Sequence, residues 1–200
     1  MKKLETFMVK KGGRSGVYIT FPSTRKEIRK RLRSIGIVKN EWETVAVKTG
    51  SNVFADAVVA CKNLDELNYL GYWMSQFSEE EYHAFFELCN AGCSEGNSIA
   101  GYINVAANIK NYFRLDGIRN ETDLGRRMVG EYLRKRGDNV LDVWKAVDED
   151  FEEIGLRYTV EKHGHYFEGN FYGRTDNWER VYNGEDDDIP EDLLIDSIRI

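Results

Sequence analysis

Short stretches of alternating hydrophobic and polar residues fill the first sixty positions, and this period of two is typical of half-buried strands. Thr24 and Glu27 have the spacing of a capping box, which predicts a helix start, and Gly36 is placed to end that helix. Strands are predicted over residues 5–10, 16–21, 42–48 and 53–60. This region therefore predicts a small sheet with one helix packed on it.

From Asn63 onwards the hydrophobic positions recur every three to four residues, as on one face of a helix. Asn63 and Ser78 each precede acidic residues in the manner of an N-cap, so both predict helix starts. Further helices are predicted over residues 98–109, 123–136 and 141–154, with a hairpin or paired strands over 156–173. The pattern predicts an α+β fold of three modules, spanning residues 1–62, 63–111 and 112–200.

The composition of the 200 residues, 42% hydrophobic and 31% charged, favours a packed core. No apolar run approaches the ~18–20 residues that span a bilayer, and the N-terminus lacks the pattern of a secretory signal. Three cysteines are too few for a disulfide framework. Together these features predict a cytoplasmic protein.

Charge is distributed unevenly along the chain, whose formal net charge is −6. Residues 1–60 hold 13 Lys and Arg against 5 Asp and Glu, a net charge of +8. Residues 61–200 hold 15 Lys and Arg against 29 Asp and Glu, a net charge of −14. Such asymmetry indicates different partners, or different faces that meet one partner.

Metal and covalent chemistry find little support in the sequence. The candidate zinc ligands are Cys89 and Cys93, with His83, His163 and His165. Their spacing lacks the two close pairs of structural zinc sites, and Cys89 falls on the apolar side of a predicted helix. No cysteine has the local signature of a catalytic nucleophile, and the glycine-rich stretch 11–16 matches neither phosphate-binding motif. We therefore predict no catalytic residue, no metal and no cofactor.

The predicted N-terminal helix has a basic face that suits contacts with phosphates. Its possible nucleic-acid contacts are Arg25, Lys26, Arg29, Lys30 and Arg33. Three nearby aromatic residues, Tyr18, Phe21 and Trp42, lie in predicted strands, where such side chains more often belong to the core than to a stacking surface. The acidic remainder of the chain would repel the same backbone, so direct nucleic-acid binding is kept as an alternative.

Acidic residues recur at helical spacing in the rest of the chain, which places their carboxylates about 5–6 Å apart on one helix face. Duplex DNA carries one negative charge per ~1.7 Å of its axis. A stiff acidic surface can therefore occupy the DNA-binding groove of another protein and compete for its Lys and Arg side chains. The ordinary alternative is a solvated acidic face.

Several motifs resemble the ArdA family of antirestriction proteins. The octet Asn63-Leu-Asp-Glu-Leu-Asn-Tyr-Leu70, followed by Ser78-Glu-Glu-Glu81, is similar to the middle region of that family. The later motifs that resemble the family are Gly101-Tyr-Ile-Asn-Val, Asn108-Ile-Lys-Asn-Tyr112, Asp123-Leu-Gly-Arg-Arg-Met-Val-Gly-Glu131 and Tyr172-Gly-Arg174. The similarity spans residues 17–175 in patches.

The resemblance implies an elongated, three-module α+β protein that forms a homodimer and imitates bent B-form DNA. It also implies that the protein occupies the DNA-binding groove of type I restriction-modification enzymes, without catalytic activity or a cofactor. In the middle module the imitating surface would consist of Asp65, Glu66, Glu79, Glu80 and Glu81. In the last module it would consist of Asp142, Asp148, Glu149, Glu152 and Glu153.

The first module departs from that family, whose members are acidic throughout, because its net charge is +8. Two alternatives follow. The chain is an inhibitor of a CRISPR effector such as Cas9, or it is a nucleic-acid-binding accessory protein of a mobile element that uses its basic N-terminal module. An enzyme is the weakest hypothesis, since no nucleophile–base pair or ligand cluster stands out.

Overall fold

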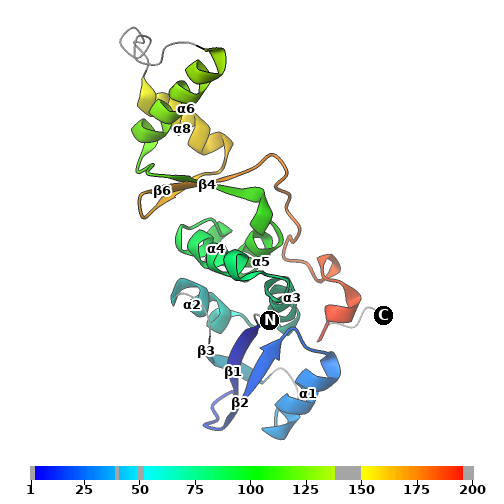
Figure 1. Cartoon of the computed structure of the whole chain (residues 1–200). Helices are drawn as coiled ribbons and strands as arrows, with labels where there is room; N and C mark the ends of the chain where they lie inside the picture. The colour runs from blue at the N-terminus through cyan, green and yellow to red at the C-terminus, as the bar shows by residue number, and fades with distance from the viewer. Residues whose placement is uncertain (1–2, 39–40, 49–51, 138–149, 196–200) are drawn as a thin grey trace. The chain divides into compact units, whose positions relative to one another are not determined.

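The computed structural model describes residues 3–38, 41–48, 52–137 and 150–195. The chain divides into two compact units, one formed by Met1–Ile109 with Glu179–Ile200 and the other by Lys110–Trp178. The described residues contain seven α-helices and two three-stranded antiparallel sheets (Figure 1). This confirms the prediction of an α+β fold built from several modules.

Unit 1 begins with a sheet whose strand order is β2-β1-β3. Its strands are β1 (Leu4–Lys10), β2 (Gly16–Phe21) and β3 (Trp42–Val47). Helix α1 (Arg25–Ser34) starts with the predicted capping box, in which Thr24 and Glu27 exchange hydrogen bonds. The helix buries Ile28 and Leu32, whose spacing of four residues places them on one face. Local sequence signals were therefore sufficient to predict these three strands and this helix.

The predicted strand over residues 53–60 is wrong, because this stretch forms helix α2 (Asn52–Ala60). Phe54 and Val58, four residues apart, are fully buried. The ring of Phe54 meets that of Phe85 edge-on, with centroids 5.7 Å apart. A run rich in valine and alanine favours a strand locally, but burial with a period of four fixes the helix.

The rest of unit 1 is helical, with α3 (Leu64–Ser75), α4 (Glu79–Asn90), the short 3₁₀ turn η1 (Glu95–Asn97) and α5 (Ile99–Ala107). The side chains of Asn63, Ser78 and Ser98 cap the three α-helices, the first two as predicted. Helix α3 packs closely on β2, since a side chain at Gly71 would collide with Phe21. The predicted boundary at residue 62 thus lies inside one compact unit.

The described residues of unit 2 form a second sheet, of strand order β4-β6-β5, and two helices. Its elements are β4 (Tyr112–Asp116), α6 (Glu121–Arg136), α8 (Phe151–Glu161), β5 (His165–Phe167) and β6 (Asn170–Arg174). The core is built on Ile118, Leu124 and Phe171, with Phe113 and Tyr158 packed against it.

Most of the helix predicted over residues 141–154 lies outside the described residues. Helix α8 starts at Phe151, with Asp150 as its N-cap, and continues to Glu161. The prediction of strands from residue 156 is therefore wrong at its start, and the hairpin comprises only β5 and β6. The helix continues because Phe151, Ile154 and Tyr158 keep helical spacing on its less exposed side.

Helices α6 and α8 approach each other through their backbones. A side chain at Gly125 would collide with the carbonyl oxygen of Phe151, and one at Gly155 would collide with that of Glu121. Each glycine thus faces the first turn of the other helix, so the two helices are antiparallel. The contact explains why small residues occupy these two helical positions.

Candidate partner-binding surfaces

Asp65, the first predicted surface carboxylate, is fully buried. Its carboxylate accepts a hydrogen bond from the backbone N–H of Ile195, at the end of the described chain. The prediction that Asp65 faces a partner is therefore wrong. Asp65 is the second residue of α3, in its first turn, where the C-terminal segment covers it.

Glu66 is half-buried and also turned toward the C-terminal segment. Its carboxylate accepts a hydrogen bond from the Tyr182 hydroxyl at 3.0 Å and lies 3.5 Å from Cys61 Sγ. Burial, together with the nearby carboxylate, raises the pKa of Tyr182, which favours its protonated, donating form. Glu66 is thus a structural acceptor, which corrects its assignment to an outward surface.

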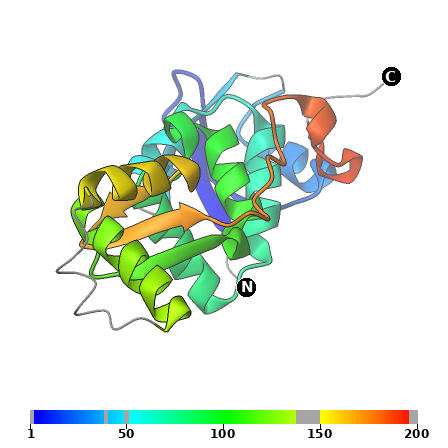
Figure 2. The ribbon, with the colours of Figure 1, turned by 90° about the horizontal axis from the view of Figure 1, so that it is seen from above.

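Asparagine side chains hold the same C-terminal segment along α5. Asn104 Nδ2 donates to the carbonyl oxygen of Tyr182 at 2.7 Å, and its Oδ1 accepts from the N–H groups of Val181 and Tyr182 at 2.8 and 2.9 Å. Asn108 bonds both backbone groups of Glu179, at 2.7 and 3.1 Å. Figure 2 shows this segment, in orange and red, running along the green helices of unit 1.

Asn68 completes the attachment from α3. It is fully buried, donates to the carbonyl oxygen of Leu193 at 2.8 Å and accepts from the N–H of Ser23 at 2.9 Å. Five polar side chains of the motifs that resemble ArdA therefore bind backbone groups within unit 1, those of Asn63, Asp65, Asn68, Asn104 and Asn108. Sequence reasoning missed this role, although asparagines on apolar helix faces are a signal for it.

Between these attachment points lies an acidic stretch, which we call the acidic ribbon (residues 185–192). It contains the 3₁₀ turn η3 (Asp186–Asp188) and the start of η4 (Glu191–Leu193). Asp188 accepts two hydrogen bonds from Asn183, at 2.7 and 3.2 Å. Five other carboxylates of the described ribbon are exposed, on Glu185, Asp186, Asp187, Glu191 and Asp192.

The predicted acids of α4 occupy its first turn. Glu79 and Glu80 are exposed, and Glu79 lies 3.6 Å from His83. Glu81 accepts the N–H of Ser78 at 2.8 Å as half of the capping box, so its carboxylate serves the helix start. Carboxylates in a first turn also interact favourably with the helix dipole, which stabilises α4 whatever partner it meets.

The predicted acids of unit 2 are only partly described. Glu152 and Glu153 are exposed in the first turn of α8, where Glu153 pairs with Arg157. Asp142, Asp148 and Glu149 lie outside the described residues. The structure thus brings Glu152 and Glu153 together on one helix end and leaves the other three unplaced.

The basic side chains predicted on α1 lie on its solvent side. Arg25, Lys26, Lys30 and Arg33 are exposed and Arg29 is half-buried. Glu27 is engaged in the capping box, where its bonds to Thr24 lower its pKa. Arg31, also exposed, donates to the carbonyl oxygen of Tyr18 at 3.2 Å. The helix therefore presents a cationic face at the edge of the sheet.

The cysteines are buried and form no disulfide. Burial raises the pKa of Cys61 to about 12 and that of Cys89 well above its usual range, so neither thiol is a ready nucleophile. His165 is half-buried, and burial lowers its pKa. Among the residues that the structure describes, no three His, Cys, Asp or Glu side chains are grouped to hold a metal ion.

In the described ranges, no helix is both long and apolar enough to cross a membrane. Comparison with known proteins finds no family model that matches the chain and no significant match to a curated protein.

Proposed function

We propose that this chain is a non-enzymatic inhibitor of a bacterial DNA-targeting enzyme and acts by presenting carboxylates in place of DNA phosphates. The proposal rests on the motifs that resemble ArdA and names a type I restriction-modification enzyme as the target. It places the protein in the cytoplasm of a bacterial host, as a homodimer without a cofactor. A CRISPR effector such as Cas9 is the alternative target of the same mechanism.

The observation that carries the proposal is the acidic ribbon. Its exposed carboxylates fall within eight residues, between the attachments at Tyr182 and Leu193. Strand or 3₁₀ backbone advances about 2–3.4 Å per residue, so charges on this segment are spaced as densely as phosphates along one DNA strand. Anchoring the backbone reduces the entropy lost when the ribbon binds a rigid groove.

Competition for DNA tests the proposal directly. The full chain should displace duplex DNA from a type I methyltransferase, and its direct binding to that enzyme should weaken between about 50 and about 200 mM salt because salt screens contacts between exposed charges. A parallel arm with Cas9 distinguishes the two targets. If saturating protein leaves DNA binding by both enzymes unchanged, the proposal is wrong.

A matched pair of variants locates the surface. The first replaces Glu185, Asp186 and Asp187 by the corresponding amides. Asp188 is kept because it accepts the backbone N–H of Asn183. The control replaces three exposed acids of unit 2, Asp116, Glu161 and Glu168, in the same way. Both change the net charge equally, so a loss of inhibition only in the first variant assigns the effect to the acidic ribbon.

A second candidate function is nucleic-acid binding through α1, favoured by the exposed cations on that helix. Charge reversal of Arg25, Lys26, Arg29 and Lys30 should abolish function if this candidate is right. The same change should only modulate inhibition if the acidic ribbon is the active surface. A gel shift with duplex DNA, run beside the competition assay, separates the two.

A further inference from the structure

The sheet of unit 1 has one buried face, and the opposite face, which we call the open face, is partly open to solvent: Glu5 and Phe7 are half-buried on it and Val9 is buried. Leu4, Met8, Ile19 and Phe21 are buried on the inner face. Residues of β1 at the alternate positions point to the other side of the sheet. Tyr18, one residue from Ile19 along β2, is 53% exposed. The sequence-based interpretation of Phe21 and Trp42 as core residues is therefore confirmed, whereas Tyr18 lies outside the core.

An aromatic pair lies on the open face. Phe7 and Tyr18 are direct partners in the pairing of β1 with β2, and their ring centroids are 4.9 Å apart. Gly16, two residues before Tyr18, leaves room for the Phe7 ring, because a Cβ there would lie 2.6 Å from its edge. The two rings are tilted by 50° to each other, and Phe7 is half-buried while Tyr18 is exposed. The pair therefore forms an aromatic platform on which a planar group can stack, mainly against the Tyr18 ring.

Cations surround this platform. Lys48 Nζ lies 5.9 Å from the Tyr18 ring centroid, and Arg31 donates to the Tyr18 carbonyl oxygen at the edge of β2. Two further cations, Lys11 and Arg14, are exposed in the β1–β2 turn. This turn begins at Lys11, four residues beyond Phe7 and about 13 Å along the strand, whereas Lys10 still belongs to β1 and lies on the Met8 side of the sheet.

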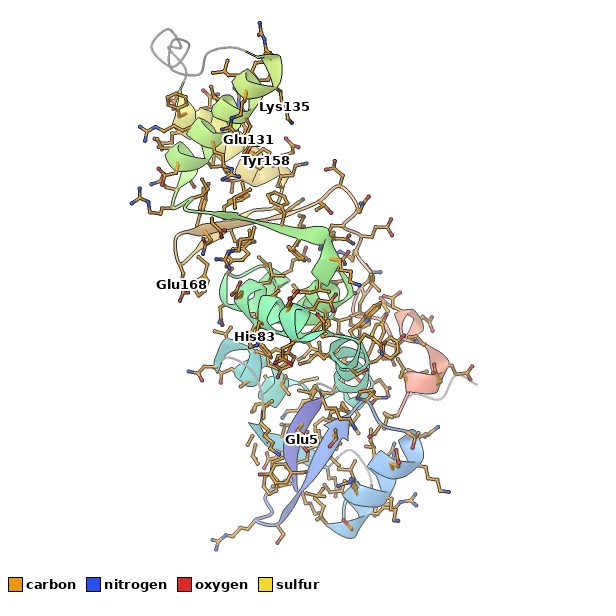
Figure 3. All side chains as sticks on the ribbon, in the orientation of Figure 1. Glu5, His83, Glu131, Lys135, Tyr158 and Glu168 are labelled. Carbon is orange, nitrogen blue, oxygen red and sulfur yellow. The ribbon has the colours of Figure 1, made fainter. Side chains whose placement is uncertain are left out.

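Three acidic groups lie on or beside the open side. Glu5, labelled in Figure 3, is neutralised locally, since it lies 2.7 Å from Lys48 Nζ and its pKa is lowered by that contact. Glu43 is half-buried on β3. Glu41 is exposed, and its backbone carbonyl accepts the Lys11 N–H at 2.8 Å. Because Lys48 and Glu5 offset each other, Arg31, Lys11 and Arg14 stand against Glu41 and Glu43. The surroundings of the aromatic pair therefore carry a small positive net charge.

We propose that the open face of the β2-β1-β3 sheet binds single-stranded nucleic acid, with unpaired bases stacked on Phe7 and Tyr18 and the backbone held by the surrounding cations. Unpaired bases expose the flat surfaces that such a platform needs, whereas the bases of a duplex are stacked on each other. This function goes beyond inhibition by the acidic ribbon and uses the opposite charge.

Fluorescence anisotropy with the full chain tests the proposal. The probes are fluorescein-labelled oligo(dT), oligo(U) and a duplex of the same length. The wild-type chain should bind one or both single strands more tightly than the duplex, and the preferred strand identifies the natural ligand as DNA or RNA. No binding of either single strand at low salt, or tighter binding of the duplex, would overturn the proposal.

Substitutions on the platform separate stacking from charge. Y18A should weaken single-strand binding between about fivefold and a hundredfold, and Y18F should retain it, because stacking requires only the ring. The matched control V45A removes a residue that is 48% exposed on the same sheet and should bind normally. Equal affinities for Y18A and wild type would overturn the proposal, since Tyr18 is too exposed for its loss to unfold the sheet.

The salt dependence of the affinity tests the contribution of the cations. K48Q should reduce the slope of log affinity against log salt by about 0.7, the value for one contacted phosphate of a single strand. An unchanged slope would count against the assignment of Lys48. Because Y18A leaves every carboxylate of the acidic ribbon in place, it should inhibit the methyltransferase normally, so failure of one proposal is distinguishable from failure of the other.

Discussion

Unit 1 and unit 2 both combine a three-stranded antiparallel sheet with helices, yet they hold distant segments together by different means. In unit 1, Asn104 and Asn68 bond the backbone of residues 78 and 125 positions away in the sequence. In unit 2, Gly125 and Gly155 let two helices touch through backbone atoms. The first unit uses directional polar contacts and the second uses the absence of side chains.

The difference has a consequence for function. Hydrogen bonds from side chain to backbone do not depend on which side chains the bound segment carries. The C-terminal segment can therefore be fixed in place while its carboxylates remain exposed. A contact between helix backbones constrains both partners, because neither has room for an added atom. Unit 1 is accordingly the better platform for a variable charged surface.

Alanine at the glycine contact should produce the largest loss of stability. In G125A and G155A the new methyl group meets a backbone carbonyl that cannot rotate away. We expect each variant to lose at least about 3 kcal/mol of unfolding free energy, at the upper end of overpacking effects. Urea denaturation followed by circular dichroism measures the loss, and hydrogen exchange assigns it to unit 2. The control K135A, on the exposed side of α6, should match the wild type.

Removal of the Asn104 side chain should have the next largest effect. N104A leaves the N–H groups of Val181 and Tyr182 and the carbonyl of Tyr182 without their partner in a buried site. The expected loss is about 2–3 kcal/mol. It should appear as faster amide exchange along residues 179–195. N90A, at the exposed end of α4, is the control, and equal exchange in both variants would contradict the anchoring role.

Within unit 1, the starts of the elements and the types of the elements differed in how well the sequence predicted them. The capping residues Thr24, Asn63 and Ser78 were predictable because each acts within three residues of itself. The strand predicted over residues 53–60 was wrong because a valine-rich run is compatible with a strand or a helix, and only its packing partners decide between them. Element starts were thus legible in the sequence, whereas the choice of element in apolar runs needed tertiary context.

The candidate surfaces were harder to predict for a physical reason. Asp65 was assigned to the surface through the resemblance to ArdA, and the partner that allows its burial lies 130 residues away. Tyr18 was grouped with core aromatics because alternation gives two faces without indicating which one is covered. The acidic ribbon was visible as a run of charge, but its rigidity depends on the distant asparagines.

The next largest expected effect is that of alkaline pH, which should begin to destabilise unit 1 at a lower pH than unit 2. Burial raises the pKa of Cys61 from 9.0 to about 12 and also raises that of Cys89, and both belong to unit 1. Above pH ~9 the unfolded chain releases these protons while the folded chain retains them. The contribution of these thiols to stability should therefore be constant below that pH and fall above it by ~1.4 kcal/mol per pH unit for each group, until the folded chain also releases the proton.

In unit 2 the corresponding groups are Tyr158 and Tyr166, whose pKa is raised from 10.0 by burial. The stability of unit 2 should therefore begin to fall about one pH unit higher than that of unit 1. Hydrogen exchange at several pH values, corrected for intrinsic rates, measures both units in one sample. C61A should flatten the decline in unit 1, and an unchanged slope in that variant would contradict the role of the buried thiol.

The smallest expected effect comes from helix caps, which both units use in the same way. Ser78 Oγ accepts the Glu81 N–H at 3.1 Å in unit 1, and Asn120 Oδ1 accepts the Asp123 N–H at 2.9 Å in unit 2. S78A and N120A should each cost about 1 kcal/mol, because one N–H in the first turn loses its acceptor. The controls S78T and N120D keep an acceptor and should lose much less. Exchange should increase only in α4 for S78A and only in α6 for N120A. A similar loss of protection in both helices from either variant would show that the two units unfold together. Asparagine anchoring and the glycine contact would then stabilise one cooperative structure, and the comparison between the units would not hold.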